Sequence, residues 1–151
     1  MTQVDFHFNA PDKWSYVCRL LRKASGQGKK VGVLANVEIS DLLNQSLWNL
    51  NPSDFVTHCA ASDSMEMLQH SSIIFSTDWA VLMGLSQLDV HLNLNDVPPS
   101  DFEGVSRLIE VVGPEDRDKT SARQRWKQYT QLGFNINRFD LASVNSATSG
   151  Q

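Results

Sequence analysis

Residues 4–34 have the sequence VDFHFNAPDKWSYVCRLLRKASGQGKKVGVL, and this stretch decides the fold. Its first part, Val4 to Phe8, alternates apolar and polar side chains, which predicts a β-strand. Its last part, Val31 to Leu34, is a short apolar run typical of a buried strand. With a helix between them, these segments predict a right-handed βαβ unit with parallel strands.

The helix between the two strands carries signals at both ends. Asp12 is placed to cap its start, and Gly26 and Gly28 are placed to end it. Apolar residues recur at spacings of three and four, which gives the helix one apolar face. These residues are Trp14, Val17, Cys18 and Leu21.

The rest of the chain continues the alternation of strands and helices. Ser40 is expected to cap a helix over residues 41–50, and Pro114 to lie in the first turn of a last helix that Gly133 ends. Residues 60–71 are mostly polar and are predicted as loop with at most a helical turn. Further strands are predicted at residues 55–59, 73–76, 88–94 and 108–112, the last being the final strand.

These elements predict an α/β fold of three layers, with a mostly parallel central sheet flanked by helices. We expect one domain over residues 1–140, because 151 residues suffice for a single buried core. Residues 141–151 are small and polar and are expected to form a disordered tail.

Composition limits the classes of function. The net charge of −4 and a pI near 5.4 argue against general nucleic-acid binding, which favours basic domains. The first ten residues lack the basic and apolar regions of a signal peptide, and no apolar run approaches the length of a membrane span. We therefore expect a cytoplasmic protein without a membrane partner, with Cys18 and Cys59 both reduced.

No catalytic or cofactor motif emerges from the sequence. Residues 25–30, SGQGKK, resemble a phosphate-binding loop, but they follow a helix, precede a strand and lack the Ser or Thr after the lysine. The first strand ends without the glycines of a dinucleotide-binding site. The histidines and cysteines lack the spacing of metal ligands. We therefore expect no catalytic residues, no metal and no cofactor. The histidines are His7, His58, His70 and His91.

The last predicted helix concentrates positive charge on an acidic chain. Lys119, Arg123 and Lys127 are four residues apart and share one stripe of the helix, with Trp126 and Tyr129 beside them. One interpretation is a solvated charged face whose aromatic rings turn into the core. The other is a surface pocket whose cations bind carboxylates while aromatic surface accepts an apolar side chain.

A second candidate surface lies where Trp48 ends a predicted helix and Phe55 begins a predicted strand. Burial of both rings in the core is one interpretation, and exposure of both is the other. If both are exposed, they form the kind of aromatic patch that marks a protein interface.

Three motifs resemble the chi subunit family of bacterial DNA polymerase III, and the similarity extends to about Phe139. The most specific motif runs through RWKQY, residues 125–129, to GFN, residues 133–135. The others are GKKV, residues 28–31, and Leu47-Trp48 followed by FVTH, residues 55–58. The resemblance implies a Rossmann-like fold without nucleotide binding and a non-catalytic role in the clamp-loader assembly.

The resemblance also implies a ligand for the last helix. Chi subunits bind the acidic C-terminal tail of single-stranded-DNA-binding protein, in which carboxylates are followed by a Pro-Phe end. Here Lys119 and Arg123 would receive carboxylates, Lys127 would extend the basic stripe, and Trp126 would border the phenyl pocket, where tyrosine is common in the family. Val112, in the loop before the helix, would belong to the apolar rim.

A second partner implied by the resemblance is the psi subunit, which tethers chi to the clamp loader. Trp48 and Phe55, with Leu47, match the aromatic pair associated with psi binding and, in some bacteria, with an alternative helicase partner. DNA would then be contacted only indirectly. The alternatives are a small α/β enzyme and a direct binder of single-stranded nucleic acid that uses the basic helix as a stacking platform.

Overall fold

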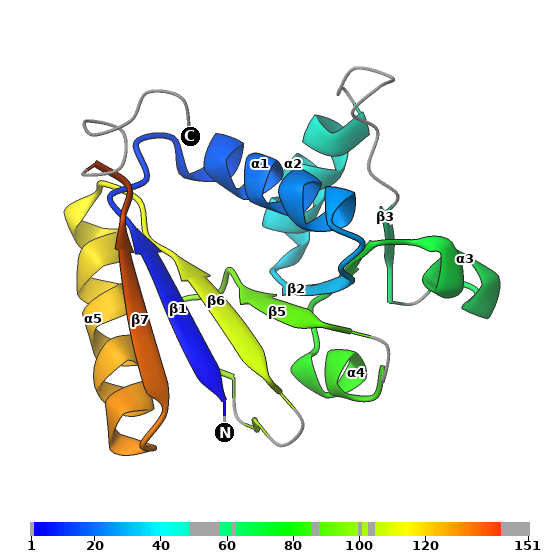
Figure 1. Cartoon of the computed structure of the whole chain (residues 1–151). Helices are drawn as coiled ribbons and strands as arrows, with labels where there is room; N and C mark the ends of the chain where they lie inside the picture. Colours follow the sequence, from blue (N-terminus) through cyan, green and yellow to red (C-terminus); the bar gives the residue numbers. More distant parts are fainter. Residues whose placement is uncertain are drawn as a thin grey trace.

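The computed structural model describes residues 2–48, 58–61, 63–85, 88–99, 101–102 and 105–142. These residues form one sheet of seven strands in the order β3-β4-β2-β5-β6-β1-β7, in which all neighbours are parallel (Figure 1). The strands are β1 (Gln3–Phe8), β2 (Val31–Leu34), β3 (His58–Ala60), β4 (Ile73–Ser76), β5 (Val90–Asn93), β6 (Arg107–Val111) and β7 (Asn135–Asp140). The helices are α1 (Lys13–Gly26), α2 (Val37–Trp48), α3 (Met65–His70), α4 (Trp79–Met83) and α5 (Asp116–Gln131).

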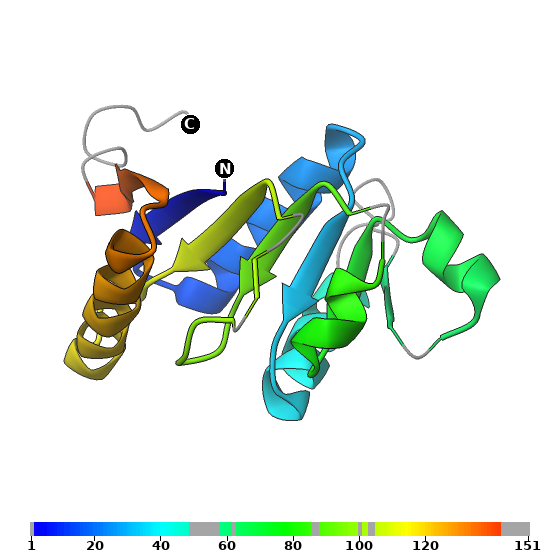
Figure 2. The same cartoon turned by 90° about the horizontal axis from the view of Figure 1, so that it is seen from below.

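Helices cover both faces of this sheet, which gives three layers (Figures 1 and 2). On one face, Val17 and Leu21 of α1 and Leu43 of α2 pack with inward side chains of the central strands. On the other face, Trp79 of α4 and Tyr129 of α5 belong to a second buried cluster. The predicted three-layer α/β fold with a parallel sheet is confirmed.

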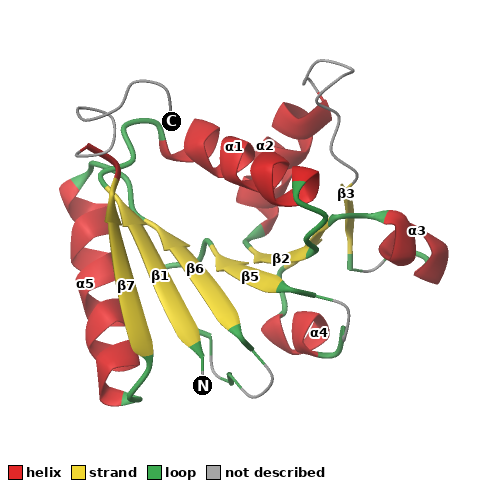
Figure 3. Cartoon of the chain, viewed as in Figure 1, coloured by secondary structure: helices red, strands yellow, loops and turns green. Residues whose placement is uncertain are grey.

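The opening strands β1 and β2 run parallel, as predicted, but they are not neighbours. β6 and β5 lie between them in the sheet, so α1 crosses over two strands on its way from one to the other (Figure 3). The sequence predicts the crossover because it is local, whereas the strands inserted between β1 and β2 come from much later in the chain.

Local signals place α1 as predicted. The carboxylate of Asp12 accepts hydrogen bonds from the backbone N–H of Ser15 at 3.3 Å and from its hydroxyl at 2.9 Å. The helix ends at Gly26, and Gly28 follows with a φ of 75°, a left-handed conformation that glycine adopts at no steric cost. Gly133, with a φ of 79°, ends α5 in the same way.

The start of α2 corrects the sequence prediction. The helix begins at Val37, and the side-chain oxygen of Asn36 accepts a 2.9 Å hydrogen bond from the backbone N–H of Ile39. Asn36 therefore caps the helix and Ser40 lies within it. Both residues are good caps, and Asn36 comes first along the chain. The predicted helix end at residues 49–50 and the predicted strand start at 55–57 lie outside the described residues, as do residues 143–151 of the predicted tail.

Two elements escape the sequence prediction, a helix occupies a predicted loop, and the start of the last helix shifts. The strand β7, at the edge of the sheet, and the five-residue helix α4 are absent from the predicted set. A helix, α3, occupies Met65–His70, where mostly loop is predicted. Pro114 precedes α5, because Glu115 is the N-cap and the helix starts at Asp116.

Candidate binding groove beside helix α5

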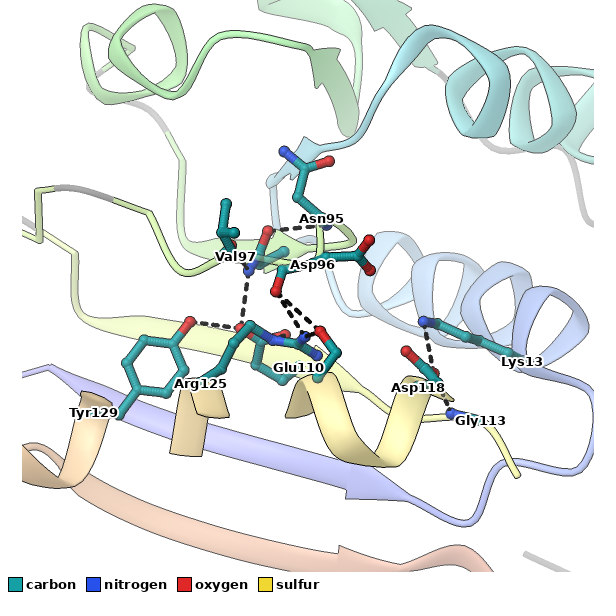
Figure 4. A network of polar contacts seen from close by, with 11 residues as sticks. Lys13, Asn95, Asp96, Val97, Glu110, Gly113, Asp118, Arg125 and Tyr129 are labelled. Atoms are coloured by element: carbon teal, nitrogen blue, oxygen red, sulfur yellow. Dashed lines mark hydrogen bonds and ion pairs between the residues drawn. The ribbon is translucent and has the colours of Figure 1, made fainter. Parts of the chain in front are cut away.

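The N-terminal end of α5 is fixed by Asp118 (Figure 4). Its carboxylate accepts a 2.7 Å hydrogen bond from the backbone N–H of Gly113 and forms a 3.0 Å ion pair with Lys13 of α1. Asp116 and Asp118 both lie in the first turn, where negative charge interacts favourably with the helix dipole. The acids that open this helix therefore have a structural role.

The middle of α5 is fixed by a buried network around Glu110 of β6 (Figure 4). The Glu110 carboxylate, which is 0% exposed, accepts hydrogen bonds from Arg125 Nε at 3.1 Å, from the Tyr129 hydroxyl at 2.5 Å and from Asn93 Nδ2 at 2.9 Å. Arg125 Nη1 also donates to the backbone oxygen of Asp96 at 3.2 Å. Each charge in this network has several partners, which is the condition for tolerating charges in a core.

Burial and hydrogen bonding shift the titration of this network. Burial raises the pKa of Glu110, while Arg125 and the hydrogen bonds from Tyr129 and Asn93 oppose that shift. Burial and the neighbouring Glu110 raise the pKa of Tyr129, so its hydroxyl remains a proton donor at any physiological pH. Tyr129 therefore turns into the core, as the first interpretation of the basic helix expects, whereas Arg125 is a buried cation and not part of a solvated face.

The adjacent face of α5 fits the second interpretation. Lys119, Arg123 and Trp126 line a groove of about 480 Å³ together with Val112 and Arg138, and we call this site the α5 groove. Its apolar part also includes Phe6 and Phe8 of β1 and Ala122 of α5. Four residues predicted from the sequence as tail-binding, Lys119, Arg123, Trp126 and Val112, thus lie along one surface feature. Lys127 is exposed and is not among the lining residues.

Trp126 is the aromatic wall of the α5 groove. Its ring is half-buried and packs on Phe6, with centroids 5.1 Å apart. The guanidinium of Arg138 lies 5.7 Å from the Trp126 ring centroid and 6.0 Å from that of Phe8, within the range of cation–π contacts. Arg138 was missed by the sequence analysis, because its position depends on β7, which was not predicted.

The charged side chains that line the α5 groove are all positive. Lys119, Arg123 and Arg138 contribute three cations, and none of the described lining residues is acidic. The groove therefore offers positive charge next to aromatic surface, which suits a ligand with carboxylates beside an apolar group.

The second candidate surface is described only in part. Leu47 is 0% exposed and belongs to the core cluster under α1 and α2, so it supports the end of α2 from inside. Trp48 is the last residue of α2. Phe55 and the side chain of Trp48 lie outside the described residues.

The structure also bears on three other features that the sequence raised: metal ligands, membrane spans and the segment at residues 25–30. In the described ranges, no group of three or more His, Cys, Asp or Glu side chains is placed to hold a metal ion. Of the helices in these ranges, none is long and apolar enough to cross a membrane. The segment at residues 25–30 forms the end of α1 and the turn into β2, which agrees with its interpretation as a helix stop.

Fold and groove together define a parallel α/β protein with an exposed cationic and aromatic binding surface. The family model for "DNA polymerase III chi subunit, HolC" matches residues 1–137. The DNA polymerase III subunit chi of Haemophilus influenzae is 30% identical over 120 residues, which cover 79% of this chain and 81% of that protein. The subunit chi of Pseudomonas aeruginosa is 25% identical over 95% of this chain and 100% of that protein. The chain belongs to the DNA polymerase III chi subunit family, and thus to the proteins of DNA replication.

Proposed function

We propose that this chain is a non-catalytic accessory subunit of the clamp-loader assembly that bridges the psi subunit and the acidic tail of single-stranded-DNA-binding protein. The tail binds in the α5 groove, and psi binds at Trp48 and Phe55, beside Leu47 at the end of α2. The observation that supports the proposal most directly is the grouping of Lys119, Arg123, Trp126 and Val112 along one groove.

The groove provides complementary chemistry for each part of such a tail. Lys119 and Arg123 from α5 and Arg138 from β7 supply the positive charge for several carboxylates. The terminal phenyl ring can pack against the apolar lining that Trp126, Phe6 and Val112 form. Because α5 is held to the sheet by the Glu110 network, these groups are positioned before the ligand arrives, which lowers the entropy cost of binding.

A groove of this kind is partly open to solvent, so its ion pairs are screened by salt and the single contact is modest in affinity. A bridging subunit tolerates weak sites, since tethering both ends raises the effective concentration at each. The proposal therefore predicts salt-sensitive binding of the isolated tail.

The test is a titration of a fluorescent peptide with the acidic, Pro-Phe-ending tail sequence, followed by fluorescence anisotropy. Arg123→Glu should weaken binding by roughly tenfold or more, because repulsion of the carboxylates replaces attraction. A peptide without the terminal Phe should also bind more weakly, because it leaves the apolar part of the groove unfilled.

The matched control is Arg117→Glu, which makes the same charge change at an exposed position of the same helix outside the groove. Its affinity should stay close to that of the unchanged protein. If Arg117→Glu and Arg123→Glu weaken the peptide equally, the net charge of the protein and not the groove governs binding, and the site assignment is wrong.

The psi site is tested separately with Trp48→Ala. This variant should lose psi in a pull-down with purified psi subunit and should keep its affinity for the tail peptide. If a folded Trp48→Ala protein loses both ligands, the two sites are not independent and the bridging model fails.

Direct binding of single-stranded DNA is the competing function. A stacking platform needs exposed rings, and Tyr129 is 0% exposed while Trp126 packs on Phe6. Tight binding of a bare oligonucleotide at physiological salt, lost in Arg123→Glu, would favour this function over the bridge.

A further inference from the structure

A second cavity lies on the opposite face of the sheet from the α5 groove. It lies between α1 and strands of the sheet, is partly open to solvent and has a volume of about 1210 Å³; we call it the α1 cavity. Phe6 and Phe8 of β1 line the α5 groove, whereas His7 between them lines the α1 cavity, as the alternation along a strand requires. The two sites therefore share β1 but no surface.

The α1 cavity is bordered by positive charge. Arg19 and Lys23 are exposed and lie one turn apart on α1, and Lys29 follows in the turn after the helix. Arg107 of β6 also lines the cavity and forms a 2.7 Å ion pair with Asp5. The described lining residues include no Asp or Glu. The local charge is thus opposite in sign to that of the whole protein, which favours an acidic ligand.

His7 of β1 is a buried polar residue beside the cavity. His7 is 8% exposed; its Nδ1 is hydrogen-bonded to the hydroxyl of Tyr16, and its Nε2 has no hydrogen-bond partner among the described residues. Burial lowers the pKa of His7 to about 4, so the ring is neutral at pH 7. When Tyr16 donates to Nδ1, Nε2 carries the hydrogen. This unpaired donor costs stability, but the atom itself is closed to solvent, so the chemistry that the cavity offers a ligand is the positive charge along its border.

The remaining lining is apolar and mainly aliphatic. Its accessible apolar surface comes from Leu20 of α1, Phe139 of β7 and Leu141, which are at least partly exposed, whereas Leu21, Val31, Leu92 and Ile109 beneath them are core residues. Its volume exceeds the roughly 300–1,000 Å³ of common small-molecule pockets, which leaves room for a segment of polypeptide. We infer that the α1 cavity is a second docking site, which binds an acidic peptide segment of a partner protein that also carries apolar side chains.

The lining favours a peptide over a nucleic acid. A platform for successive bases needs several exposed aromatic rings, whereas among the described lining residues Phe139 is exposed and Tyr16 is half-buried and hydrogen-bonded to His7. A long polyanion would also meet the acidic remainder of a chain with a net charge of −4, whereas a short acidic segment interacts mainly with the local cations.

The experiment uses the full chain with Arg123→Glu, which weakens the α5 groove. A short fluorescein-labelled peptide of alternating aspartate and leucine is titrated by fluorescence anisotropy. Adding Arg19→Glu and Lys23→Glu should lower its affinity by roughly tenfold or more, because both charges border the cavity. A peptide with serine in place of leucine should bind more weakly, because serine cannot pack on the accessible apolar lining. If the helix variant unfolds, judged by circular dichroism, Lys29→Glu in the following turn provides the same test.

The matched control adds Arg117→Glu and Lys127→Glu instead, which are exposed on α5 and line neither site. An equal loss in this control would attribute binding to net charge and overturn the proposal. No binding of either peptide would overturn it as well. A thymidine oligonucleotide that binds more tightly than the peptide and depends on Arg19 and Lys23 would assign the cavity to nucleic acid. Loss of binding through Arg123→Glu reports the α5 groove, and loss through Arg19→Glu and Lys23→Glu reports the α1 cavity, so the two proposals fail independently.

Discussion

Arg123 and Arg125 are two residues apart on α5, yet they lie in opposite environments. Arg125 is 2% exposed and is hydrogen-bonded to Glu110, Ser121 and the backbone of Asp96. Arg123 is exposed and lines the α5 groove. The number of basic residues in a helix therefore does not measure its binding surface. The face on which each cation lies decides whether it stabilises the fold or is available to a ligand.

The largest effect should come from breaking the buried side of this comparison. Arg125→Ala leaves the carboxylate of Glu110 in the core without its counter-charge, which typically costs about 3–5 kcal/mol. The free energy of unfolding, measured by urea denaturation, should fall by that amount. The matched variant Arg123→Ala should stay within about 0.5 kcal/mol of the unchanged protein. Equal losses in the two variants would remove the distinction between the two faces.

His7 extends the comparison to the other face of the sheet, because it is buried like Glu110 but only one of its ring nitrogens has a partner. Burial lowers its pKa from 6.5 to about 4; the charge of Asp5 opposes that shift, and Arg107 and Lys23 reinforce it. As the pH falls below 6.5, the unfolded chain takes up the proton first. The stability that His7 contributes above pH 6.5 is therefore lost down to about pH 4, by about 3 kcal/mol in total.

Urea denaturation of the unchanged protein and of His7→Gln, at a series of pH values from 7 to 4, measures this contribution. His91 also has a pKa lowered by burial, so both proteins should lose stability on acidification. The difference between them isolates His7, and the variant should show the flatter curve. Parallel curves would show that His7 titrates equally in the folded and unfolded chains.

A smaller loss is expected for Tyr129→Phe. The change removes one hydrogen bond to the carboxylate of Glu110 and keeps the ring, at a cost of about 2 kcal/mol. Thr130→Ala removes a hydroxyl from the exposed side of the same helix and should cost less than about 0.5 kcal/mol. Thermal unfolding of both variants checks the contrast. A Tyr129→Phe protein as stable as the Thr130→Ala protein would show that Glu110 does not need this donor.

The features that the sequence predicted are those whose signals lie within a few neighbouring residues. Asp12 caps α1 through contacts with Ser15, and Gly28 and Gly133 act through their own backbone angles, so neighbouring residues suffice to identify them. The same holds for the stripe of Lys119 and Arg123, which one helical turn brings together.

The features that the sequence could not supply depend on distant parts of the chain. Glu110 stands in an apolar strand, and nothing in its neighbourhood indicates that Arg125 will pair with it. Arg138 reaches Trp126 because β7 adds to β1 in a register that sets Arg138 opposite Phe6. An edge strand with few apolar residues carries little periodic signal, so both β7 and the third cation of the groove were missed.

The smallest effect is expected for Lys127→Glu, which tests where the α5 groove ends on the exposed side of the helix. Lys127 shares the stripe of Lys119 and Arg123 but is not among the groove residues, so it should act on a bound tail only through screened, longer-range attraction. Lys127→Glu should therefore change the affinity of the tail peptide by less than about fivefold, the range of a weak surface charge pair. Titrations at low and high salt should show this small difference vanish with screening, while the effect of Arg123→Glu persists in part through lost contact. A Lys127→Glu defect as large as that of Arg123→Glu would mean that the bound tail runs further along α5 than the groove itself.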